Sequence, residues 1–284
     1  MAERDGYIPG VPCWVDTYQP DPEAAAAFYR GLFGWEMEDT MPPGSDGRYF
    51  MARLHGGDVA AIGSQPPGAP PAQAAWNTYV CVESADETVA RVKEAGGRVL
   101  AEPFDVFDAG RTATLTDPED AMISLWQPGT MKGAQVVNEH GAVNFNNLHT
   151  RDVEAARRFY GAVFGWHTLV VDGAELWTLP GYGDELERLT PGLRARIAEL
   201  GATPGFEDVV ATINPIGNEE PAGPPYWGVT FATDDADATA ARASELGGRV
   251  LVPPFAAPWS RITVIADPQG ASFTASQFIP ENRG

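Results

Sequence analysis

The sequence is poor in cysteine and lysine and has no long apolar run. Its two cysteines, Cys13 and Cys81, are too few for a disulfide framework and, alone, for a zinc site. No stretch approaches the roughly 18 uninterrupted apolar residues of a membrane helix. Residues 1–6 contain no basic segment leading into an apolar run, so we expect no signal peptide. These absences favour a cytoplasmic protein in a reducing compartment.

Positive charge is also scarce. Of 19 basic residues only Lys93 and Lys132 are lysines, and the formal net charge is −20. This charge repels phosphate backbones and anionic membrane surfaces, so we expect neither nucleic acid nor membrane as a partner. The nucleophile elbow, the P-loop, the dinucleotide fingerprint and the CxxC motif are absent as well.

An internal repeat sets the domain organisation. Residues 27–35 (AFYRGLFGW) recur at 158–166 (RFYGAVFGW), an offset of 131, and residues 94–100 (EAGGRVL) recur at 245–251 (ELGGRVL), an offset of 151. The difference, 20 residues, is an insertion in the middle of the second copy. A chain of 284 residues is long enough for two such domains, each with its own core.

We predict a first domain over residues 8–128, a linker over 129–140 and a second domain over 141–280. The second domain carries a helical insertion at about 183–205. Within each domain a strand, a helix and three further strands occur twice, which makes four modules. The predicted helices cover 22–33, 85–95, 152–163 and 235–246, and they follow strands at 12–18, 76–82, 143–149 and 227–232.

Local signals place the helix ends. Asp21 and Pro22 are suited to the N-cap and first turn of the first helix. In the insertion, Thr190 as N-cap and Pro191 in the first turn predict a helix over residues 191–200. We expect this insertion to lie over a binding hollow as a partial lid, or else to cap the interface between the two domains.

This organisation resembles the vicinal oxygen chelate superfamily, which includes glyoxalase I, bleomycin-resistance proteins and extradiol dioxygenases. The resemblance is strongest to tandem bacterial members labelled glyoxalase-like or hydroxylase-like. It implies an α+β fold of four βαβββ modules, forming two tandem glyoxalase-like domains with curled mixed sheets. In tandem members the first module often packs with the fourth and the second with the third. The resemblance rests on DP…AFY…FGW at 21–35, GGRV at 96–99, Asp117-Pro118 and their second copies.

Metal-dependent members of that superfamily carry His, Gln or Glu at the start of each first strand, and Glu late in a last strand. None of the residues found at the equivalent positions here is a good ligand for zinc, nickel or iron. We therefore expect no metal and no cofactor, and glyoxalase I activity and extradiol ring cleavage are disfavoured. The equivalent positions hold Trp14, Asn77, Ser124, Phe145, Gly228 and Thr274.

Strand alternation turns one polar and aromatic face of each domain toward its hollow. Such a lining is typical of a small-molecule site. Several of these aromatic residues could instead be ordinary core. The predicted ligand-binding residues are Trp14, Asn77, Tyr79, Ser124, Trp126, Phe145, Asn147, Trp177, Tyr182, Trp227 and Thr274.

Three residues on these strands are candidates for catalysis. Asp16 is a carboxylate in mid-strand, which is functional, solvated or paired with an arginine such as Arg53 or Arg111. His149 is a candidate acid or base, or a structural histidine, and Tyr18 would assist. Arg111 and its copy Arg261 could bind an anionic ligand or simply offset the surplus of acids.

Two functions remain open. In the first, the chain is a metal-independent binding protein for a hydrophobic or aromatic metabolite or drug, of the resistance or sequestration type. In the second, it is a metal-independent isomerase, cyclase, lyase or hydroxylase-type enzyme that uses Asp16 or His149 as acid or base. In both, the partner is a small organic molecule, and the chain is a monomer or a weak homodimer.

Overall fold

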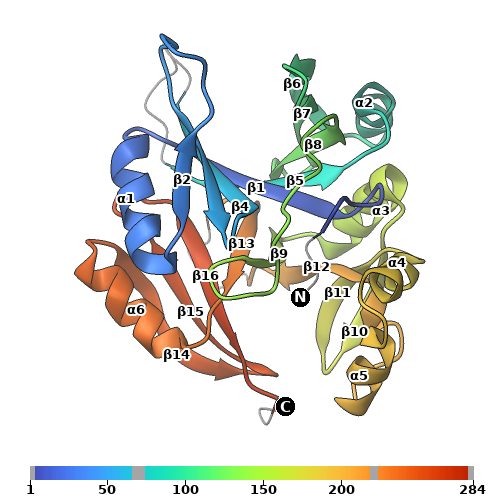
Figure 1. Cartoon of the computed structure of the whole chain (residues 1–284). Coiled ribbons are helices and arrows are strands. Elements are labelled where there is room, and N and C mark those ends of the chain that lie inside the picture. Colours follow the sequence, from blue (N-terminus) through green and yellow to red (C-terminus); the bar gives the residue numbers. More distant parts are fainter. Residues whose placement is uncertain (1–3, 66–73, 218–222, 281–284) are drawn as a thin grey trace. The chain divides into compact units, whose positions relative to one another are not determined.

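The computed structural model describes residues 4–65, 74–217 and 223–280. Four modules follow one another, each with a strand, a helix and three more strands (Figure 1). The first module contains β1 (Pro12–Gln19), α1 (Pro22–Phe33), β2 (Glu36–Asp39), β3 (Tyr49–Leu54) and β4 (Gly57–Ser64). The second contains β5 (Trp76–Cys81), α2 (Ala85–Glu94), β6 (Arg98–Val106), β7 (Gly110–Thr116) and β8 (Met122–Pro128).

The second copy repeats this order and adds helices before its fourth strand. The third module contains β9 (Val143–Thr150), α3 (Val153–Phe164), β10 (His167–Val171), β11 (Ala174–Thr178), α4 (Tyr182–Leu189), α5 (Leu193–Glu199), η1 (Phe206–Asp208) and β12 (Val209–Pro215). The fourth contains β13 (Tyr226–Ala232), α6 (Ala236–Glu245), β14 (Arg249–Ala257), β15 (Ser260–Ala266) and β16 (Ser272–Phe278).

The strands form two open eight-stranded sheets, in the orders β2-β3-β4-β1-β5-β8-β7-β6 and β10-β11-β12-β9-β13-β16-β15-β14. Both sheets are mixed. The pairs β1–β4, β5–β8, β9–β12 and β13–β16 are parallel, whereas the hairpins within each module are antiparallel. The predicted α+β fold of four modules is confirmed.

The chain divides into two compact units, and each unit joins one module from each copy of the repeat. The second and third modules make up most of unit 1, and the first and fourth make up most of unit 2, which is the pairing that the family resemblance implies. Among the described residues, unit 1 contains those within 1–13, 78–133 and 145–227, and unit 2 contains those within 14–77, 134–144 and 228–284.

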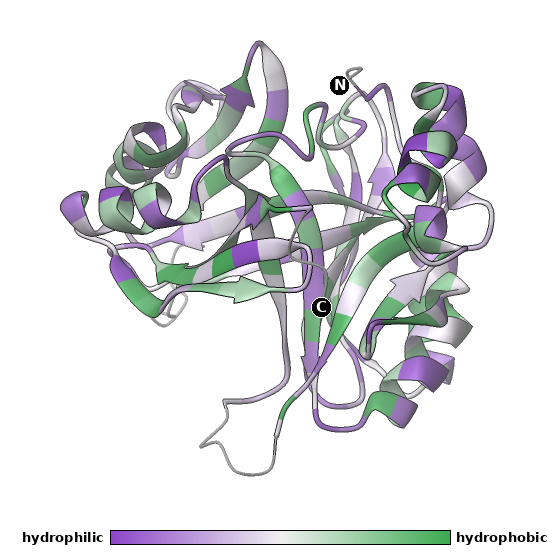
Figure 2. Ribbon diagram, turned by 90° about the horizontal axis from the view of Figure 1, so that it is seen from below, coloured by the Kyte–Doolittle hydropathy of each residue, from purple (hydrophilic) through white to green (hydrophobic). Residues whose placement is uncertain are grey.

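Helix α1 in unit 2 shows why the first repeated motif forms a helix of this length. Asp21 Oδ1 accepts from the backbone N–H of Ala24, and Pro22 lies in the first turn, as predicted. Gly34 ends the helix with a φ of +73°, a left-handed conformation that glycine adopts without steric cost. In Figure 2, hydrophilic and hydrophobic residues both occur around the helices, as expected where one face covers a core.

The aromatic residues of the repeated motif form the core of each unit. In unit 2, where α1 and α6 lie side by side, the ring of Tyr29 stacks on that of Trp35 at 5.2 Å. In unit 1, Tyr160 stacks on Trp166 in the same way at 5.5 Å. Tyr160 and Trp166 are the second-copy counterparts of Tyr29 and Trp35. Both cores therefore contain the same pair of buried aromatic residues.

The second repeated motif requires glycine for close packing. A Cβ on Gly97 would lie 2.7 Å from the carbonyl oxygen of Thr116 and 2.7 Å from the ring of Phe159. Any side chain at this position would therefore push α2 away from its sheet and from α3. The Gly-Gly pair thus allows the helix to end directly against the core.

The insertion differs from its prediction. Two helices form where one was expected: α4 was not predicted, and α5 begins after Gly192, in a left-handed conformation, rather than at Thr190 and Pro191. Tyr182 at the start of α4 is 6% exposed and belongs to the core of unit 1, and its hydroxyl accepts from Arg4 Nη1 at 2.9 Å. Within the described residues, no helix combines the length and the apolar character needed to cross a membrane.

Candidate functional site

Asp16 on β1 is a carboxylate buried in unit 2, with 1% of its surface exposed. Its Oδ1 accepts from Asn77 Nδ2 at 2.8 Å, and its Oδ2 accepts from the hydroxyl of Tyr49 at 3.1 Å. A buried carboxylate is tolerated only when hydrogen bonds replace the lost water. Two neutral donors from β5 and β3 therefore hold Asp16 in one orientation.

Aromatic rings surround this carboxylate. The indole N–H of Trp14 approaches the hydroxyl of Tyr49 at 3.5 Å, and the rings of Tyr18 and Tyr49 lie 6.4 Å apart. Burial raises the pKa of the Tyr49 phenol, and the charge of Asp16 raises it further, so this hydroxyl stays protonated and keeps donating. We call Trp14, Asp16, Tyr18, Tyr49 and Asn77 the Asp16 cluster.

Gly63 on β4 makes room for the two tyrosine rings of the Asp16 cluster. It is the register partner of Tyr18 on β1 and of Tyr49 on β3. A Cβ at this position would lie 2.8 Å from the ring of Tyr18 and 3.0 Å from that of Tyr49. The missing side chain of β4 therefore sets where both rings lie.

The arginines proposed as partners of Asp16 pair with other acids. Arg53 binds Asp58 at 2.8 Å and also Glu38. Arg111 binds Asp86 in the first turn of α2 at 2.8 Å and Asp105 on β6 at 2.9 Å. The hypothesis that Arg53 or Arg111 forms the ion pair of Asp16 is wrong, because both guanidinium groups bind other carboxylates.

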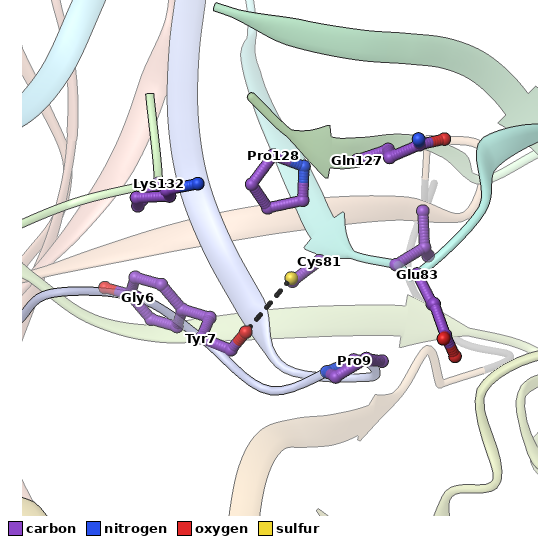
Figure 3. Close-up of a pocket in the computed structure, with 9 residues that line it drawn as sticks. Gly6, Tyr7, Pro9, Cys81, Glu83, Gln127, Pro128 and Lys132 are labelled. Atoms are coloured by element: carbon purple, nitrogen blue, oxygen red, sulfur yellow. Dashed lines mark hydrogen bonds between the residues drawn. The ribbon is translucent and has the colours of Figure 1, made fainter. Parts of the chain in front are cut away.

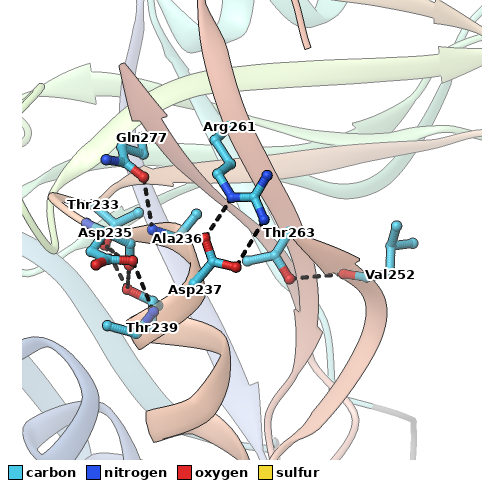
Figure 4. Close-up of polar contacts among 10 residues, drawn as sticks. Thr233, Asp235, Ala236, Asp237, Thr239, Val252, Arg261, Thr263 and Gln277 are labelled. Carbon is cyan, nitrogen blue, oxygen red and sulfur yellow. Dashed lines mark hydrogen bonds and ion pairs between the residues drawn. The ribbon is translucent and has the colours of Figure 1, made fainter. Parts of the chain in front are cut away.

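Arg261 repeats the arrangement of Arg111 in the fourth module. Its Nη2 binds Asp237 Oδ1 at 2.8 Å in the first turn of α6 (Figure 4). Beside it, Gln277 Oε1 accepts from the backbone N–H of Ala236, and Asp235 caps the helix. The side chain of Arg261 therefore ties β15 to the start of α6, which favours the charge-offsetting role over an anion site.

A second polar cluster lies on β9 in unit 1, at the positions that copy Asp16 and Tyr18. Thr212 Oγ1 on β12 donates to Asn147 Oδ1 at 2.8 Å, and Asn214 Nδ2 approaches Thr212 Oγ1 at 3.4 Å. The imidazole of His149 stacks on the ring of Tyr226, with 4.3 Å between centroids and 4° between planes. We call Asn147, His149, Thr212, Asn214 and Tyr226 the Asn147 cluster.

His149 supplies the imidazole of the Asn147 cluster. Burial lowers the pKa of its imidazole from the ordinary value, because desolvation disfavours the charged form. The ring is therefore neutral at pH 7 and has one nitrogen able to accept a proton. Asp16 and His149 belong to different units, so a paired role for them has no support.

Three residues predicted to bind a ligand are core residues of unit 1. Trp177 has no exposed surface, and Trp227 is buried with its indole N–H donating to Tyr160 at 2.8 Å. Tyr182 packs in the same core. This arrangement favours the alternative that these aromatics are core, because they are packed on all sides by other side chains.

The other predicted ligand-binding residues lie on strands of both units. In unit 1 the rings of Tyr79 and Trp126 meet edge to face at 6.5 Å, and the indole N–H of Trp126 donates to Met131 O at 3.0 Å. Ser124 is buried and shares a 3.3 Å hydrogen bond with Thr114. Half-buried positions are occupied by Phe145 on β9 in unit 1 and by Thr274 on β16 in unit 2.

Sequence reasoning missed Tyr49 and Tyr226, which complete the two clusters. Tyr49 begins β3, but nothing in the local sequence indicates that its hydroxyl reaches a residue 33 positions earlier. Tyr226 lies just before a predicted strand, outside the alternating pattern that assigns side chains to a face. In the structure its side chain is 46% exposed. Only the pairing of strands from distant segments identifies these contacts.

The residues at the metal-ligand positions of the resembled family do not fit a metal ion. Trp14 offers an N–H donor, and Asn77 directs its amide nitrogen to Asp16. Ser124 is engaged with Thr114. Across residues 4–65, 74–217 and 223–280, no group of three or more His, Cys, Asp or Glu side chains is placed to hold a metal. This donor set lacks the imidazoles and carboxylates that zinc, nickel and iron require.

One protein-family model matches both halves of the chain. Residues 14–125 and 142–274 each match the model described as the Glyoxalase/Bleomycin resistance protein/Dioxygenase superfamily. This chain belongs to that superfamily. The two matches follow the two copies of the internal repeat, so each copy is a glyoxalase-superfamily domain.

Relatives in the superfamily match along the whole chain. The protein named "Putative glyoxylase CFP32" from Mycobacterium tuberculosis is 40% identical over 283 residues, covering 99% of this chain and 100% of the relative. The anthracycline biosynthesis protein DnrV of Streptomyces peucetius is 34% identical and covers 94% of this chain and 93% of its own length.

Solved structures of the superfamily share the fold. The Mn(II)-bound glyoxalase from Novosphingobium aromaticivorans has a TM-score of 0.59 at 15% identity, covering 95% of this chain and 82% of that chain. The 2,3-dioxygenase LapB from Pseudomonas sp. KL28 has a TM-score of 0.58 at 13% identity, with coverages of 95% and 93%. At this identity the likeness concerns the fold alone.

Proposed function

We propose that this superfamily member binds a planar aromatic organic molecule, without a metal ion, at the Asp16 cluster. The observation that carries the proposal is the buried carboxylate of Asp16, held by Tyr49 and Asn77 among aromatic rings. Small-molecule sites combine an apolar, aromatic lining with a few placed polar groups. The Asp16 cluster has this composition.

The rings supply the contact area of the proposed site. Tyr18, Tyr49 and Asn77 are partly exposed, so one side of the cluster is accessible to a ligand, whereas Trp14 and Asp16 lie behind them. A flat ligand would stack on the tyrosine rings, since offset and edge-to-face ring pairs contribute about 0.5–1.5 kcal/mol beyond area burial. Hydroxyl and amide groups would orient it.

The negative charge of Asp16 favours aromatic ligands that carry a positive charge. A carboxylate in a low-dielectric surrounding attracts a cation more strongly than an exposed one does. The net charge of −20 also raises the local concentration of cations around the chain. A polycyclic ligand with an amino group is therefore preferred, and relatives named for anthracycline biosynthesis support this chemical class.

The test compares a polycyclic aromatic quinone bearing an amino sugar with the same quinone lacking the amine. Binding is followed by quenching of tryptophan fluorescence and by the shift in melting temperature. We expect the amine-bearing compound to bind more tightly, and Asp16→Asn to lose roughly tenfold in its affinity, equivalent to about 1.4 kcal/mol. Asp58→Asn, in the same unit and paired with Arg53, is the matched control.

Two results would contradict the proposal. One is equal affinity of Asp16→Asn and the unchanged chain for the amine-bearing compound. The other is a stoichiometric, tightly held transition metal in the purified protein, together with loss of binding after chelation. We expect instead that exhaustive dialysis against a chelator leaves the affinity unchanged.

His149 favours a second candidate function, metal-independent acid–base catalysis in the Asn147 cluster. A neutral imidazole next to amide and hydroxyl groups is suited to accept a proton from a bound organic molecule. His149→Gln should then abolish turnover while affinity is kept, and Tyr226→Phe, which keeps the stacked ring, should retain it. Product formed at an unchanged rate by His149→Gln would eliminate this candidate.

A further inference from the structure

Unit 1 contains a pocket of about 580 Å³ that neither the Asp16 cluster nor the Asn147 cluster lines (Figure 3). Small-molecule sites usually have volumes of about 300–1,000 Å³, so this pocket has the size of a binding site. Four segments from separate parts of the sequence form its walls. They contribute residues 6–9 before β1, residues 81–83 at the end of β5, residues 127–128 at the end of β8, and Lys132 in the following linker.

Hydrogen bonds hold the N-terminal wall of the pocket against β5. The backbone N–H of Gly10 donates to the carbonyl oxygen of Cys81 at 2.8 Å, and the backbone N–H of Cys81 donates to that of Val11 at 2.9 Å. The Cys81 thiol donates to the carbonyl oxygen of Tyr7 at 3.3 Å (Figure 3). Cys81 therefore fixes the segment that closes one side of the pocket.

The linker wall is packed just as closely. Gly133, next to Lys132, has a φ of +115°, and a Cβ at this position would lie 2.8 Å from the ring of Tyr7. Before it, the carbonyl oxygen of Met131 accepts from the indole N–H of Trp126 at 3.0 Å. The linker thus rests directly on the N-terminal segment, and the pocket is already formed without a ligand.

Two opposite charges line this pocket without meeting each other. Among the residues that the structure describes, Glu83 forms no ion pair. Within the same residues, the ammonium of Lys132 binds no carboxylate and donates only to the carbonyl oxygen of Gly129. In Figure 3 the side chains of Glu83 and Lys132 lie on either side of Cys81. A ligand between them could satisfy both charges.

The second copy of the repeat satisfies the corresponding carboxylate internally. Asp234 is the copy of Glu83 at an offset of 151, and His140 is the copy of Pro9 at an offset of 131. The Nδ1 atom of His140 lies 3.9 Å from Asp234 Oδ2 and accepts from the Asp234 backbone N–H at 3.2 Å. Proline has no group that can make either contact. The first copy therefore leaves its carboxylate open to a ligand.

We infer that this pocket binds a zwitterionic amino acid with an apolar side chain. The ammonium group of the amino acid pairs with Glu83 and its carboxylate pairs with Lys132. Both protein side chains are long and exposed, so they can close on two groups that are near each other. The apolar side chain of the ligand packs against Pro9 and Pro128.

Charge and size both favour this class of ligand. A net charge of −20 repels anions, but a zwitterion carries no net charge and is not excluded. A water molecule occupies about 30 Å³ in the liquid, so a pocket of this volume has room for a large side chain. This site is separate from the Asp16 cluster, which we propose to bind an aromatic cation.

The experiment measures binding to the full-length protein by isothermal titration calorimetry with three probes. L-phenylalanine carries both charges, phenethylamine lacks the carboxylate, and 3-phenylpropionate lacks the ammonium group. We expect L-phenylalanine to bind at one site, roughly tenfold more tightly than either of the other two. Equal affinities for the three probes, or no heat of binding with L-phenylalanine at millimolar concentration, would overturn the inference.

Variants of the two charged residues place the binding in this pocket. Glu83→Gln should remove the preference for L-phenylalanine over 3-phenylpropionate, and Lys132→Gln should remove the preference over phenethylamine. Both positions are exposed, so both variants should fold normally. Glu94→Gln and Lys93→Gln, at exposed positions of α2 outside the pocket, are the matched controls and should keep the affinity. Preferences that survive in Glu83→Gln and Lys132→Gln would show that L-phenylalanine binds elsewhere and would contradict the inference.

Discussion

The hydroxyl of Tyr160 donates a 2.9 Å hydrogen bond to the buried carboxylate of Asp117. Their copies, Tyr29 and Asp267, make the same bond at 3.1 Å. In each pair the tyrosine comes from the FY motif of one module and the aspartate from the DP motif of another. The two repeated motifs therefore bind each other, and each compact unit contains one such bond.

Removing the Tyr160 hydroxyl should destabilise unit 1. Tyr160→Phe leaves the Asp117 carboxylate short of one donor and the indole N–H of Trp227 without its acceptor. We expect a loss of about 1–3 kcal/mol in the free energy of unfolding, measured by urea denaturation. Tyr226→Phe, at an exposed position, should change it by less than about 0.5 kcal/mol. Equal losses of unfolding free energy in the two variants would show that the buried hydrogen bond contributes no more to stability than the exposed hydroxyl of Tyr226.

The pH dependence of Asp117 has a defined sign. Burial raises its pKa in the folded chain, and the hydrogen bonds from Ala121, Tyr160 and Glu119 offset this only in part. The folded chain therefore binds this proton more tightly than the unfolded chain does. The stability that the group contributes is complete below its unfolded pKa and is lost as pH rises through the raised value.

We thus expect the difference in unfolding free energy between the unchanged chain and Asp117→Asn to be largest at acid pH and to shrink as pH rises. Denaturation curves at a series of pH values measure it. Exposed carboxylates with lowered pKa, such as Asp86 and Asp237, are common to both proteins and cancel in the difference. A difference that grows with pH would show that the folded-state pKa is lowered instead.

Two tryptophans of the same core should respond differently to the same substitution. The indole N–H of Trp227 donates to Tyr160, whereas that of Trp177 has no hydrogen-bond partner among the described residues. Trp227→Phe should therefore cost about 1 kcal/mol more than Trp177→Phe in the free energy of unfolding. Chemical denaturation of the two variants measures the gap. If Trp177→Phe were the more damaging, its indole nitrogen would have a partner that the structure does not show.

The titration of His149 should report its burial. Desolvation lowers the pKa of the imidazole, so the ring stays neutral at pH values where an exposed histidine is already charged. Stability that depends on the neutral ring is lost as pH falls through the lowered pKa. Tyr226→Ala removes the stacked ring and should move the pKa back toward 6.5. Tyr226→Phe keeps the stack and should leave it lowered. NMR of the imidazole signals distinguishes these outcomes.

Gly63 offers a test of the Asp16 cluster that touches no polar group. In Gly63→Ala the new methyl group meets the rings of Tyr18 and Tyr49, which must move. We expect weaker binding of the aromatic ligand with little change in fold, measured by fluorescence quenching and circular dichroism. Gly47→Ala, whose methyl group meets Ser64 at an ordinary 3.4 Å, is the control. Unchanged affinity of Gly63→Ala would place the ligand elsewhere.

Local signals predicted the helices well and the insertion poorly. Residues 22–33 form the predicted helix, because Asp21, Pro22 and Gly34 act within one turn of its ends. In the insertion, the same kind of signal at Thr190 and Pro191 was overruled, and α5 starts after Gly192 instead. Short helices with few buried residues depend on their neighbours more than on their caps.

Strand alternation predicted which face of β1 carries Trp14, Asp16 and Tyr18, and the structure gathers these residues in one cluster. It did not predict Tyr49, because a hydrogen bond between β1 and β3 depends on strand register across the sheet. The expected pairing of Arg53 with Asp16 was wrong for the same reason, because it also depends on contacts across the sheet. An arginine and an aspartate can be matched by charge in a sequence, but only geometry decides which of several acids each arginine meets.

The sequence by itself determined the duplication, the order of elements, the superfamily and the shortage of metal-binding side chains at its ligand positions. These features are carried by repeats, caps and alternation, which act over a few residues. Only the tertiary structure decided that Trp177 and Trp227 are core and that Tyr49 on β3 reaches Asp16 on β1. Such contacts join segments tens of residues apart, and packing of the whole chain, rather than any local preference, selects them.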